Sequence, residues 1–282
     1  MQRFTLDRWT RIGFVGLRVH DMTQMVAWYQ RTLGLTLLRQ DAHQALLGTG
    51  RRHVLAMIEG GGRLLKSPPG GLAGFGLNMP DQQSLLAVAA RLKAQGIALS
   101  WWETGFALGF SFADPEQNQL RIAYDPGLSG SITRTYDFAA GTTLPAQAPP
   151  LPTGAWAGLP DRVSLAQIVV RTQQVADTVT YLADILGFVV QQQAEDHAFL
   201  TVGDAASHIS MAVVLAKRAR PRQPNHAGGR YVNLVVSSAA ALAALEANVR
   251  GHHWPVKAVV PAQYLMVTGP NRLTLWFSVG GV

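Results

Sequence analysis

The sequence contains no cysteine among its 282 residues. This absence excludes disulfide bonds, a thiolate nucleophile and cysteine-ligated metal sites. It also fits a reducing compartment, so we expect a cytoplasmic location. No run of eighteen apolar residues occurs, and we expect no membrane-spanning helix. Residues 1–10 lack the apolar segment of a secretory signal, so none is expected either.

Charged residues are also sparse, at 15% of the chain against 48% hydrophobic residues. This balance predicts a packed core rather than disorder. The formal net charge is +7, but the basic residues are scattered, and the single cluster at residues 217–222 is interrupted by Pro221. We interpret that cluster as a solvated loop. We expect no nucleic-acid partner, because no basic stripe interleaved with aromatic residues is present.

What the sequence does contain is an internal repeat. Residues 12–59 and residues 163–214 share one layout: an apolar strand, a polar turn, a helix with a single apolar stripe, and two further short strands. A glycine, Gly34 or Gly187, stands where each helix needs a left-handed C-cap residue. The matching order of these elements predicts two copies of one module.

The repeat extends into the second part of each copy. Residues 71–124 and residues 229–277 each read as a strand, an alanine- and leucine-rich helix, and two strands joined by a turn with proline and asparagine. Each copy thus contains a β-α-β-β-β unit twice, which predicts an α+β fold of tandem βαβββ modules. The alternative is a single mixed α/β domain whose similar segments are accidental.

The domain boundaries follow from composition. We predict an N-terminal domain over 1–125, a linker over 126–161 and a C-terminal domain over 162–282. The linker is rich in glycine, proline, serine and threonine, with Pro-Pro-Leu-Pro near its middle, which is typical of an irregular connection.

Two stretches suggest a family. The segment IGFVGLRVHDMTQMVAWYQRTLGL and the closing segment DPEQNQLRIAY resemble the start and end of a vicinal oxygen chelate module. That superfamily includes glyoxalases, bleomycin resistance proteins and extradiol dioxygenases, and the paired modules are most similar to two-domain extradiol dioxygenases. The resemblance implies that the strands of each module form a cupped, mixed sheet. It also implies a divalent metal in the cup, held by two histidines and a glutamate.

The metal ligands implied by the resemblance are missing. The corresponding positions are Phe14, Gly74 and Arg121 in the first module, and Gln167, Val232 and Trp276 in the second. None of these residues is a histidine or a carboxylate. We therefore predict no metal and no cofactor.

Two histidines replace the metal as candidates for chemistry. His208 lies where dioxygenase relatives carry an acid/base histidine, and an imidazole titrates near neutral pH. We predict His208 as the acid/base group, aided by Gln167 or Tyr264. His53 is its counterpart in the first copy. For each histidine the alternative is a single structural hydrogen bond at a strand edge.

A second group of residues is predicted to contact the ligand. Trp276 and Tyr231 would form an aromatic wall, which favours a planar apolar ligand, although both could instead fill the core. Asn233 could orient a polar group or belong to a satisfied core pair. His226 is expected in a loop at the mouth of the second cup. Arg121, if it faces inward, needs either a carboxylate partner or an anionic ligand.

These features predict a metal-independent enzyme related to extradiol dioxygenases. We expect dioxygenase-like, lyase or isomerase chemistry on an aromatic or polyoxygenated small molecule in the C-terminal cup. One alternative is a metal-free protein that binds a drug or antibiotic. A second is a metal-dependent ring-cleavage dioxygenase with atypical ligands. Whether the chain forms a homo-oligomer stays open.

Overall fold

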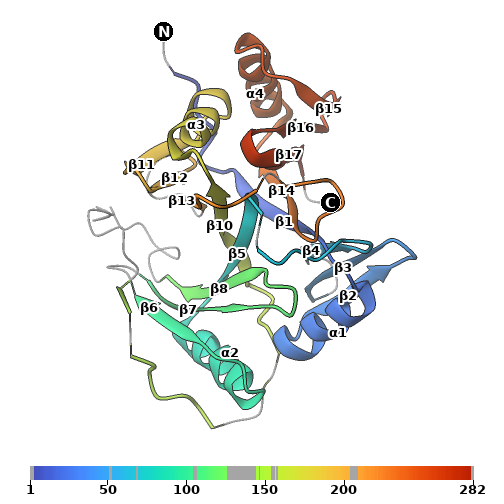
Figure 1. The fold of residues 1–282 in the computed structure, drawn as a ribbon, viewed down its shortest axis with the longest axis vertical. Coiled ribbons are helices and arrows are strands. Elements are labelled where there is room, and N and C mark those ends of the chain that lie inside the picture. The colour runs from blue at the N-terminus through green and yellow to red at the C-terminus, as the bar shows by residue number, and fades with distance from the viewer. Residues whose placement is uncertain are drawn as a thin grey trace.

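A computed structural model of the chain describes residues 3–50, 53–67, 69–103, 107–125, 144–145, 147–153, 156, 158–203, 209–220 and 222–280. For 53–54 and 144–145 it describes the backbone only. Four βαβββ units follow one another along the chain (Figure 1). Within the described part, no helix is both long and apolar enough to span a bilayer.

The first two units lie in the N-terminal half. Unit 1 comprises β1 (Arg11–Arg18), α1 (Met22–Leu33), β2 (Thr36–Gln40), β3 (Gln44–Thr49) and β4 (His53–Glu59). Unit 2 comprises β5 (Gly71–Met79), α2 (Gln82–Ala94), β6 (Ser100–Glu103), β7 (Leu108–Ala113) and β8 (Gln119–Tyr124). A two-residue strand, β9 (Leu144–Pro145), pairs with β6.

The last two units lie in the C-terminal half. Unit 3 comprises β10 (Ser164–Thr172), α3 (Val175–Thr180) continued by the π-helical turn η3 (Tyr181–Ile185), β11 (Val189–Gln193), β12 (His197–Thr201) and β13 (Ser210–Leu215). Unit 4 comprises β14 (Gly228–Val236), α4 (Ala239–Gly251), β15 (Val256–Val260), β16 (Tyr264–Thr268), the short 3-10 turn η4 (Pro270–Arg272) and β17 (Thr274–Val279).

The helix signals in the sequence are confirmed in α1. The side chain of Asp21 caps the helix by accepting a hydrogen bond from the Gln24 amide, 2.9 Å away. Gly34 ends it in the left-handed conformation, at φ 70°. Met25 and Tyr29 of the predicted stripe are fully buried. The apolar period of 3.6 residues therefore faces the core, as predicted.

The four units pair crosswise into two sheets. One is eight-stranded, in the order β15-β16-β17-β14-β1-β4-β3-β2, and joins units 4 and 1. The other is nine-stranded, in the order β11-β12-β13-β10-β5-β8-β7-β6-β9, and joins units 3 and 2. Both sheets are mixed: β1 runs antiparallel to β14 and parallel to β4, and β10 runs antiparallel to β5 and parallel to β13. The predicted fold of tandem βαβββ modules in two cupped mixed sheets is confirmed, but each sheet draws one unit from each half of the chain.

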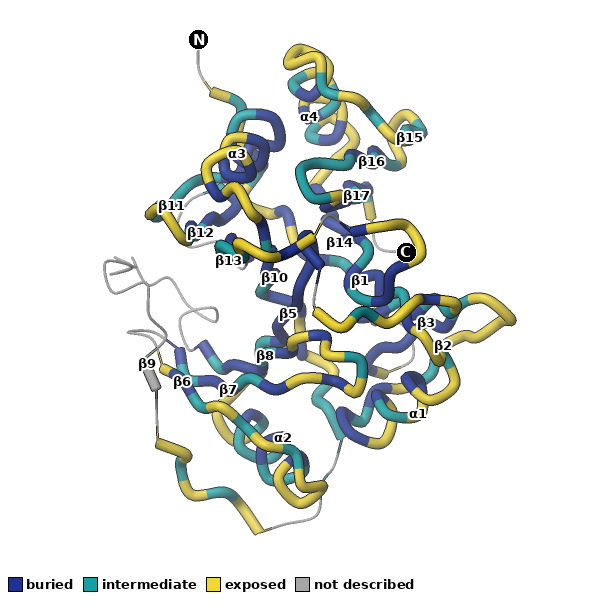
Figure 2. The backbone as a smooth tube through the Cα atoms, in the orientation of Figure 1, coloured by how far each residue is buried: buried dark blue, intermediate teal, exposed yellow. Residues whose placement is uncertain are grey.

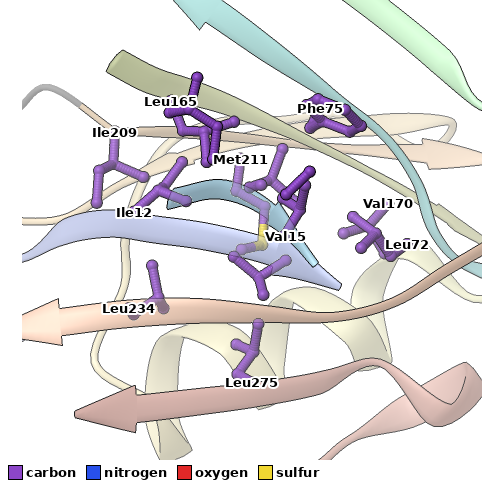
Figure 3. Packing of buried hydrophobic residues seen from close by; sticks show 14 of the residues in the cluster. Ile12, Val15, Leu72, Phe75, Leu165, Val170, Ile209, Met211, Leu234 and Leu275 are labelled. Atoms are coloured by element: carbon purple, nitrogen blue, oxygen red, sulfur yellow. The ribbon is translucent and has the colours of Figure 1, made fainter. Parts of the chain in front are cut away.

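The helices and the central strands enclose one continuous core. Apolar side chains from β1, β14, β5 and β10 meet where the two sheets approach each other (Figure 3). Burial is concentrated along these central strands, while the outer loops are exposed (Figure 2). Because the helix-covered faces point into this shared core, the opposite face of each sheet is left free to form a cup. Val15 and Val170, for example, face the core, whereas their neighbours on the same strands face a cup.

Candidate functional site

The two cups are lined by different kinds of side chain. The aromatic cup is the free face of the eight-stranded sheet, lined by Phe14, Tyr231, Tyr264 and Trp276. The arginine cup is the free face of the nine-stranded sheet. It is lined by Gly74, Gly76, Arg121 and Gln167.

The aromatic cup is filled by its own side chains. Phe14 meets Trp276 edge-on at 5.4 Å and Tyr231 edge-on at 6.1 Å between ring centroids. Tyr264 lies 5.8 Å from Trp276 in the same manner. Phe14 and Tyr231 are buried, and such edge-to-face packing stabilises a compact cluster. Of the two readings of these aromatic residues, the structure favours core packing.

Asn233 anchors the floor of the aromatic cup. Its amide nitrogen donates to the Trp276 carbonyl and to the Ser278 hydroxyl, both at 3.0 Å. Its carbonyl oxygen lies where a side chain on Gly13 would stand, and it has no hydrogen-bond partner. The two nitrogen bonds hold Asn233 in place, while its carbonyl oxygen stays unpaired, so the amide is only half satisfied.

Polar contacts close the end of the aromatic cup. The Tyr231 hydroxyl donates to the sulfur of Met57 at 2.7 Å and lies 3.4 Å from Glu59. Glu59 forms ion pairs with Arg18 and Arg230. Burial raises the pKa of Tyr231 to about 12. A phenol with such a pKa stays protonated at neutral pH and is a poor general base.

Two glycines of β5, Gly74 and Gly76, form the floor of the arginine cup. In the sheet register Gln167 pairs with Gly76, and Gly76 pairs with Arg121. A Cβ atom on Gly76 would stand 2.9 Å from the Cβ of Gln167, 3.2 Å from its Oε1 and 3.4 Å from the Cβ of Arg121. Gly76 therefore lets the side chains of Arg121 and Gln167 lie close together on either side of β5.

Arg121 is a buried cation without a counter-charge in the described part of the chain. Its guanidinium carbon lies 4.2 Å from the centre of the Trp102 ring, a cation–π contact. Trp102 is fixed in turn, because its Nε1 donates to the Ser111 hydroxyl at 3.0 Å. Burial alone lowers the pKa of Arg121 to about 10. The Nε atom of Arg121 has no hydrogen-bond partner.

Gln167 adds an unsatisfied acceptor beside this cation. Its Oε1 is buried and has no hydrogen-bond partner. A buried donor and a buried acceptor that both lack partners are costly unless a ligand or water completes them. The arginine cup thus offers a cation for an anionic group and an acceptor for a hydroxyl or amide donor.

The residues predicted to form one site are divided between the two cups. Gln167 and Arg121 share the arginine cup, although the sequence placed them in different modules. Tyr264 lies in the aromatic cup, together with Trp276. Gln167 and Tyr264, which were predicted as alternative aids to His208, lie in different cups, because β10 and β16 belong to different sheets.

The three histidines have different outcomes. His226 is buried: its Nδ1 accepts from the Gln223 amide at 3.1 Å, and its Nε2 lies 3.3 Å from a guanidinium nitrogen of Arg63. These contacts hold the loop before β14. His208 lies outside the described residues. For His53 the structure describes the backbone at the start of β4 and not the side chain.

Sequence reasoning missed Trp102 and the role of Gly76. The sequence did contain a signal for Gly76. Gly74 and Gly76 are two residues apart in a strand, so both lie on the same face and leave it without side chains at these positions. Trp102 gave no such signal, because its contact with Arg121 is made across the sheet. Val232 was assigned to a ligand position in error. It is fully buried in the core, and its neighbour Asn233 faces the cup.

The residues at the metal positions do not fit a divalent cation. The facing rows read Phe14, Asn233 and Trp276 in one cup and Gln167, Gly76 and Arg121 in the other. A guanidinium repels a cation, and phenyl and indole rings supply no lone pair for one. In the described part of the chain, no three histidine, aspartate or glutamate side chains cluster closely enough to hold an ion.

Comparison with known proteins supports the family prediction. Residues 11–122 match the family model "Glyoxalase/Bleomycin resistance protein/Dioxygenase superfamily". The catechol-2,3-dioxygenase of Bacillus subtilis strain 168 is 22% identical over 236 residues, which cover 80% of this chain and 83% of that protein.

Solved structures extend the likeness in fold to the whole chain. A dioxygenase candidate from Bacillus subtilis strain 168 superposes with a TM-score of 0.68 at 15% identity, covering 99% of this chain and 87% of its own. Glyoxalase I from Zea mays superposes with a TM-score of 0.57 at 14% identity, covering 96% and 92%. Residues 11–122 therefore carry the signature of the glyoxalase, bleomycin resistance and dioxygenase superfamily, and the chain as a whole has the vicinal oxygen chelate fold.

Proposed function

We propose that this protein binds an anionic aromatic compound in the arginine cup and acts on it without a metal. The observation that carries the proposal is Arg121, a buried guanidinium with no acidic partner among the described residues. Burying such a charge is costly unless an anion compensates it. A carboxylate or phenolate on the ligand supplies that anion and forms charge-assisted hydrogen bonds.

The neighbouring groups narrow the class of ligand. Gln167 Oε1 can accept a hydrogen bond from a ligand hydroxyl, and the ring of Trp102 beside Arg121 is an aromatic surface for a flat ligand. A hydroxybenzoate combines the anion, the ring and the hydroxyl. It is accordingly the probe with which to start.

The first experiment measures binding of 3-hydroxybenzoate by isothermal titration calorimetry. Wild type should bind it, and 3-hydroxybenzamide, which lacks the charge, should bind about tenfold or more weakly. Arg121→Gln should remove the preference for the acid over the amide. Arg39→Gln, at an exposed position on β2, removes the same charge elsewhere and should leave the preference intact. Equal affinities of wild type for acid and amide would contradict the proposal.

The second experiment separates an enzyme from a binding protein. His208 precedes Ser210 by two residues, and Ser210 pairs with Gln167 of the arginine cup. We propose His208 as the acid/base group on that basis and on its predicted role. His208→Ala should abolish turnover and keep ligand affinity. If wild type returns every bound ligand chemically unchanged, the protein is a binder, as some drug-sequestering relatives are.

Ring cleavage of the kind named for the Bacillus subtilis relative is a second candidate. Only the relationship to that protein supports it. Elemental analysis and a catechol-cleavage assay with and without added Fe(II) test this candidate. Stoichiometric bound iron or manganese, together with Fe(II)-dependent cleavage, would overturn the proposed metal independence.

A further inference from the structure

A hollow of about 510 Å³ opens on the surface where β10 ends and the chain leaves β13. Its lining residues are Ser67, Arg171, Ala216, Lys217, Arg218 and Ala219. The lining holds three basic residues and one hydroxyl, and no carboxylate. The sequence alone had suggested a solvated loop for residues 217–222, but the structure folds this loop against a strand that carries a further arginine.

Arg171 is the strand residue of this group. It lies on β10 at the second alternate position after Gln167, so both side chains leave the same face of the strand. It is half-buried, and burial lowers its pKa below the ordinary value for arginine. In the described part of the chain, its guanidinium forms no ion pair. Its charge is thus partly stripped of water without compensation.

A second guanidinium lies behind the hollow and increases the positive potential. Arg222 is buried and donates to the carbonyls of Ala227 and Leu72, both at 3.0 Å. These bonds hold it in place but supply no negative charge. Burial and the charge of Arg171 together lower the pKa of Arg222 to about 10, so the two arginines repel each other. An anion in the hollow would relieve this repulsion.

We propose that the hollow beside Arg171 is a phosphate-binding site. Arg171 offers a planar fork to two phosphate oxygens, Lys217 and Arg218 add positive charge, and the Ser67 hydroxyl is a further donor. Three cations and a hydroxyl match an oxyanion with three free oxygens better than a carboxylate. Inorganic phosphate and a phosphate ester share this chemistry. The site does not include Arg121, so it holds or fails independently of the function proposed above.

The test is calorimetric titration with inorganic phosphate and with phenyl phosphate, at constant ionic strength set by chloride. Arg171→Gln should weaken phosphate binding by about tenfold or more. Arg39→Gln and Arg121→Gln should bind phosphate as wild type does. Tighter binding of phenyl phosphate that Arg171→Gln loses and Arg121→Gln keeps would identify an ester as the ligand, whereas tighter binding of inorganic phosphate would identify the free ion.

Two results would overturn the site. One is phosphate binding by Arg171→Gln that equals wild type. The other is an equal loss in Arg39→Gln, which would show a general effect of net charge. Thermal unfolding by circular dichroism checks that each variant is folded. If Arg171→Gln does not fold, Lys217→Gln, in the exposed loop, gives the same readout, and unchanged binding by that variant would reject the site.

Discussion

At the scale of single residues, Arg121 and Asp114 are both ionisable and largely removed from water, but they differ in how many partners the chain gives them. Arg121 lacks a partner and so points to a ligand, whereas Asp114 is fully supported by the chain. Asp114 accepts hydrogen bonds from the Tyr29 hydroxyl at 2.9 Å and from the Asn118 side-chain amide at 2.7 Å. It also accepts from the backbone amides of Glu116 and Asn118. The predicted turn before β8 is therefore held by one buried carboxyl group.

Asp114 yields a prediction about pH at this scale. Burial raises its pKa above the ordinary 3.8, in spite of the hydrogen bonds that lower it. The folded state therefore binds the proton more tightly than the unfolded state, and this stabilisation is complete below pH 3.8 and is lost as the pH rises through the raised pKa. Relative to Asp114→Asn, wild type should gain unfolding free energy as the pH falls from about 7 to about 4.

Urea denaturation at each pH measures this difference. Asp41→Asn is the matched control, because hydrogen bonds from the backbone amides of His43 and Gln44 lower the pKa of Asp41. That carboxylate contributes stability above its unfolded pKa, and the contribution is lost on acidification. The advantage of wild type over Asp41→Asn should accordingly stay nearly constant between about pH 7 and 4 and shrink only below that range. A change of the same sign in both pairs would contradict the assignment to burial.

At the scale of elements, the two middle strands β5 and β14 differ in the side chains that they place on the cup face of their sheets. They hold equivalent places in their sheets, since each lies between a first strand and a last strand of a unit. On its cup face β14 carries Tyr231 and Asn233, which fill the aromatic cup. On the same face β5 carries Gly74, Gly76 and Asn78, and no aromatic side chain. The same scaffold thus holds an aromatic cluster in one sheet and two glycines in the other.

Alanine substitutions on β5 should distinguish an effect on ligand affinity from an effect on the free energy of unfolding. Gly76→Ala places its Cβ 2.9 Å from the Cβ of Gln167, which side-chain rotation does not move, and 3.2 Å from its Oε1, which can rotate away. It should weaken ligand binding in the arginine cup and cost about 1–3 kcal/mol of stability. Gly74→Ala places its Cβ 2.5 Å from the backbone oxygen of Gln119, which cannot rotate away, and should destabilise more. Calorimetric binding and urea denaturation measure the two effects, and full ligand affinity in Gly76→Ala would argue against this site.

At the scale of the whole molecule, neither half of the chain forms a complete sheet by itself. Unit 1 pairs with unit 4 through β1 and β14, and unit 2 pairs with unit 3 through β5 and β10. The predicted domain boundaries at 125 and 162 divide the sequence repeat, yet a cut there would separate the central strands of both sheets. Exposed central strands lose hydrogen-bond partners and tend to pair with other chains.

Fragments test this dependence. Residues 1–125 alone should not form a stable folded monomer, because β1 and β5 would both become edge strands. Residues 162–282 should behave likewise for β10 and β14. Co-expression of the two fragments should restore a one-to-one complex with the melting behaviour of a folded protein. Size-exclusion chromatography and amide NMR spectra provide the readout, and a well-dispersed monomeric spectrum of either fragment would disprove the dependence.

The sequence by itself determined the elements and their repetition. Apolar periodicity, capping residues such as Asp21 and Gly34, and turn residues act between neighbours in the chain, so they can be read without the fold. For the same reason the four βαβββ units and the superfamily resemblance were predicted correctly.

Only the tertiary structure decided which units share a sheet and which side chains share a cup. Strand pairing between β10 and β5 joins residues about ninety positions apart, and no local pattern encodes that choice over its alternatives. It brought Gln167 near Arg121 across Gly76 and left Tyr264 in the other sheet, while the pairing of β6, β7 and β8 placed Trp102 against the guanidinium. The repeat was legible because it is local, and the site was not, because burial and charge compensation depend on contacts distant in sequence.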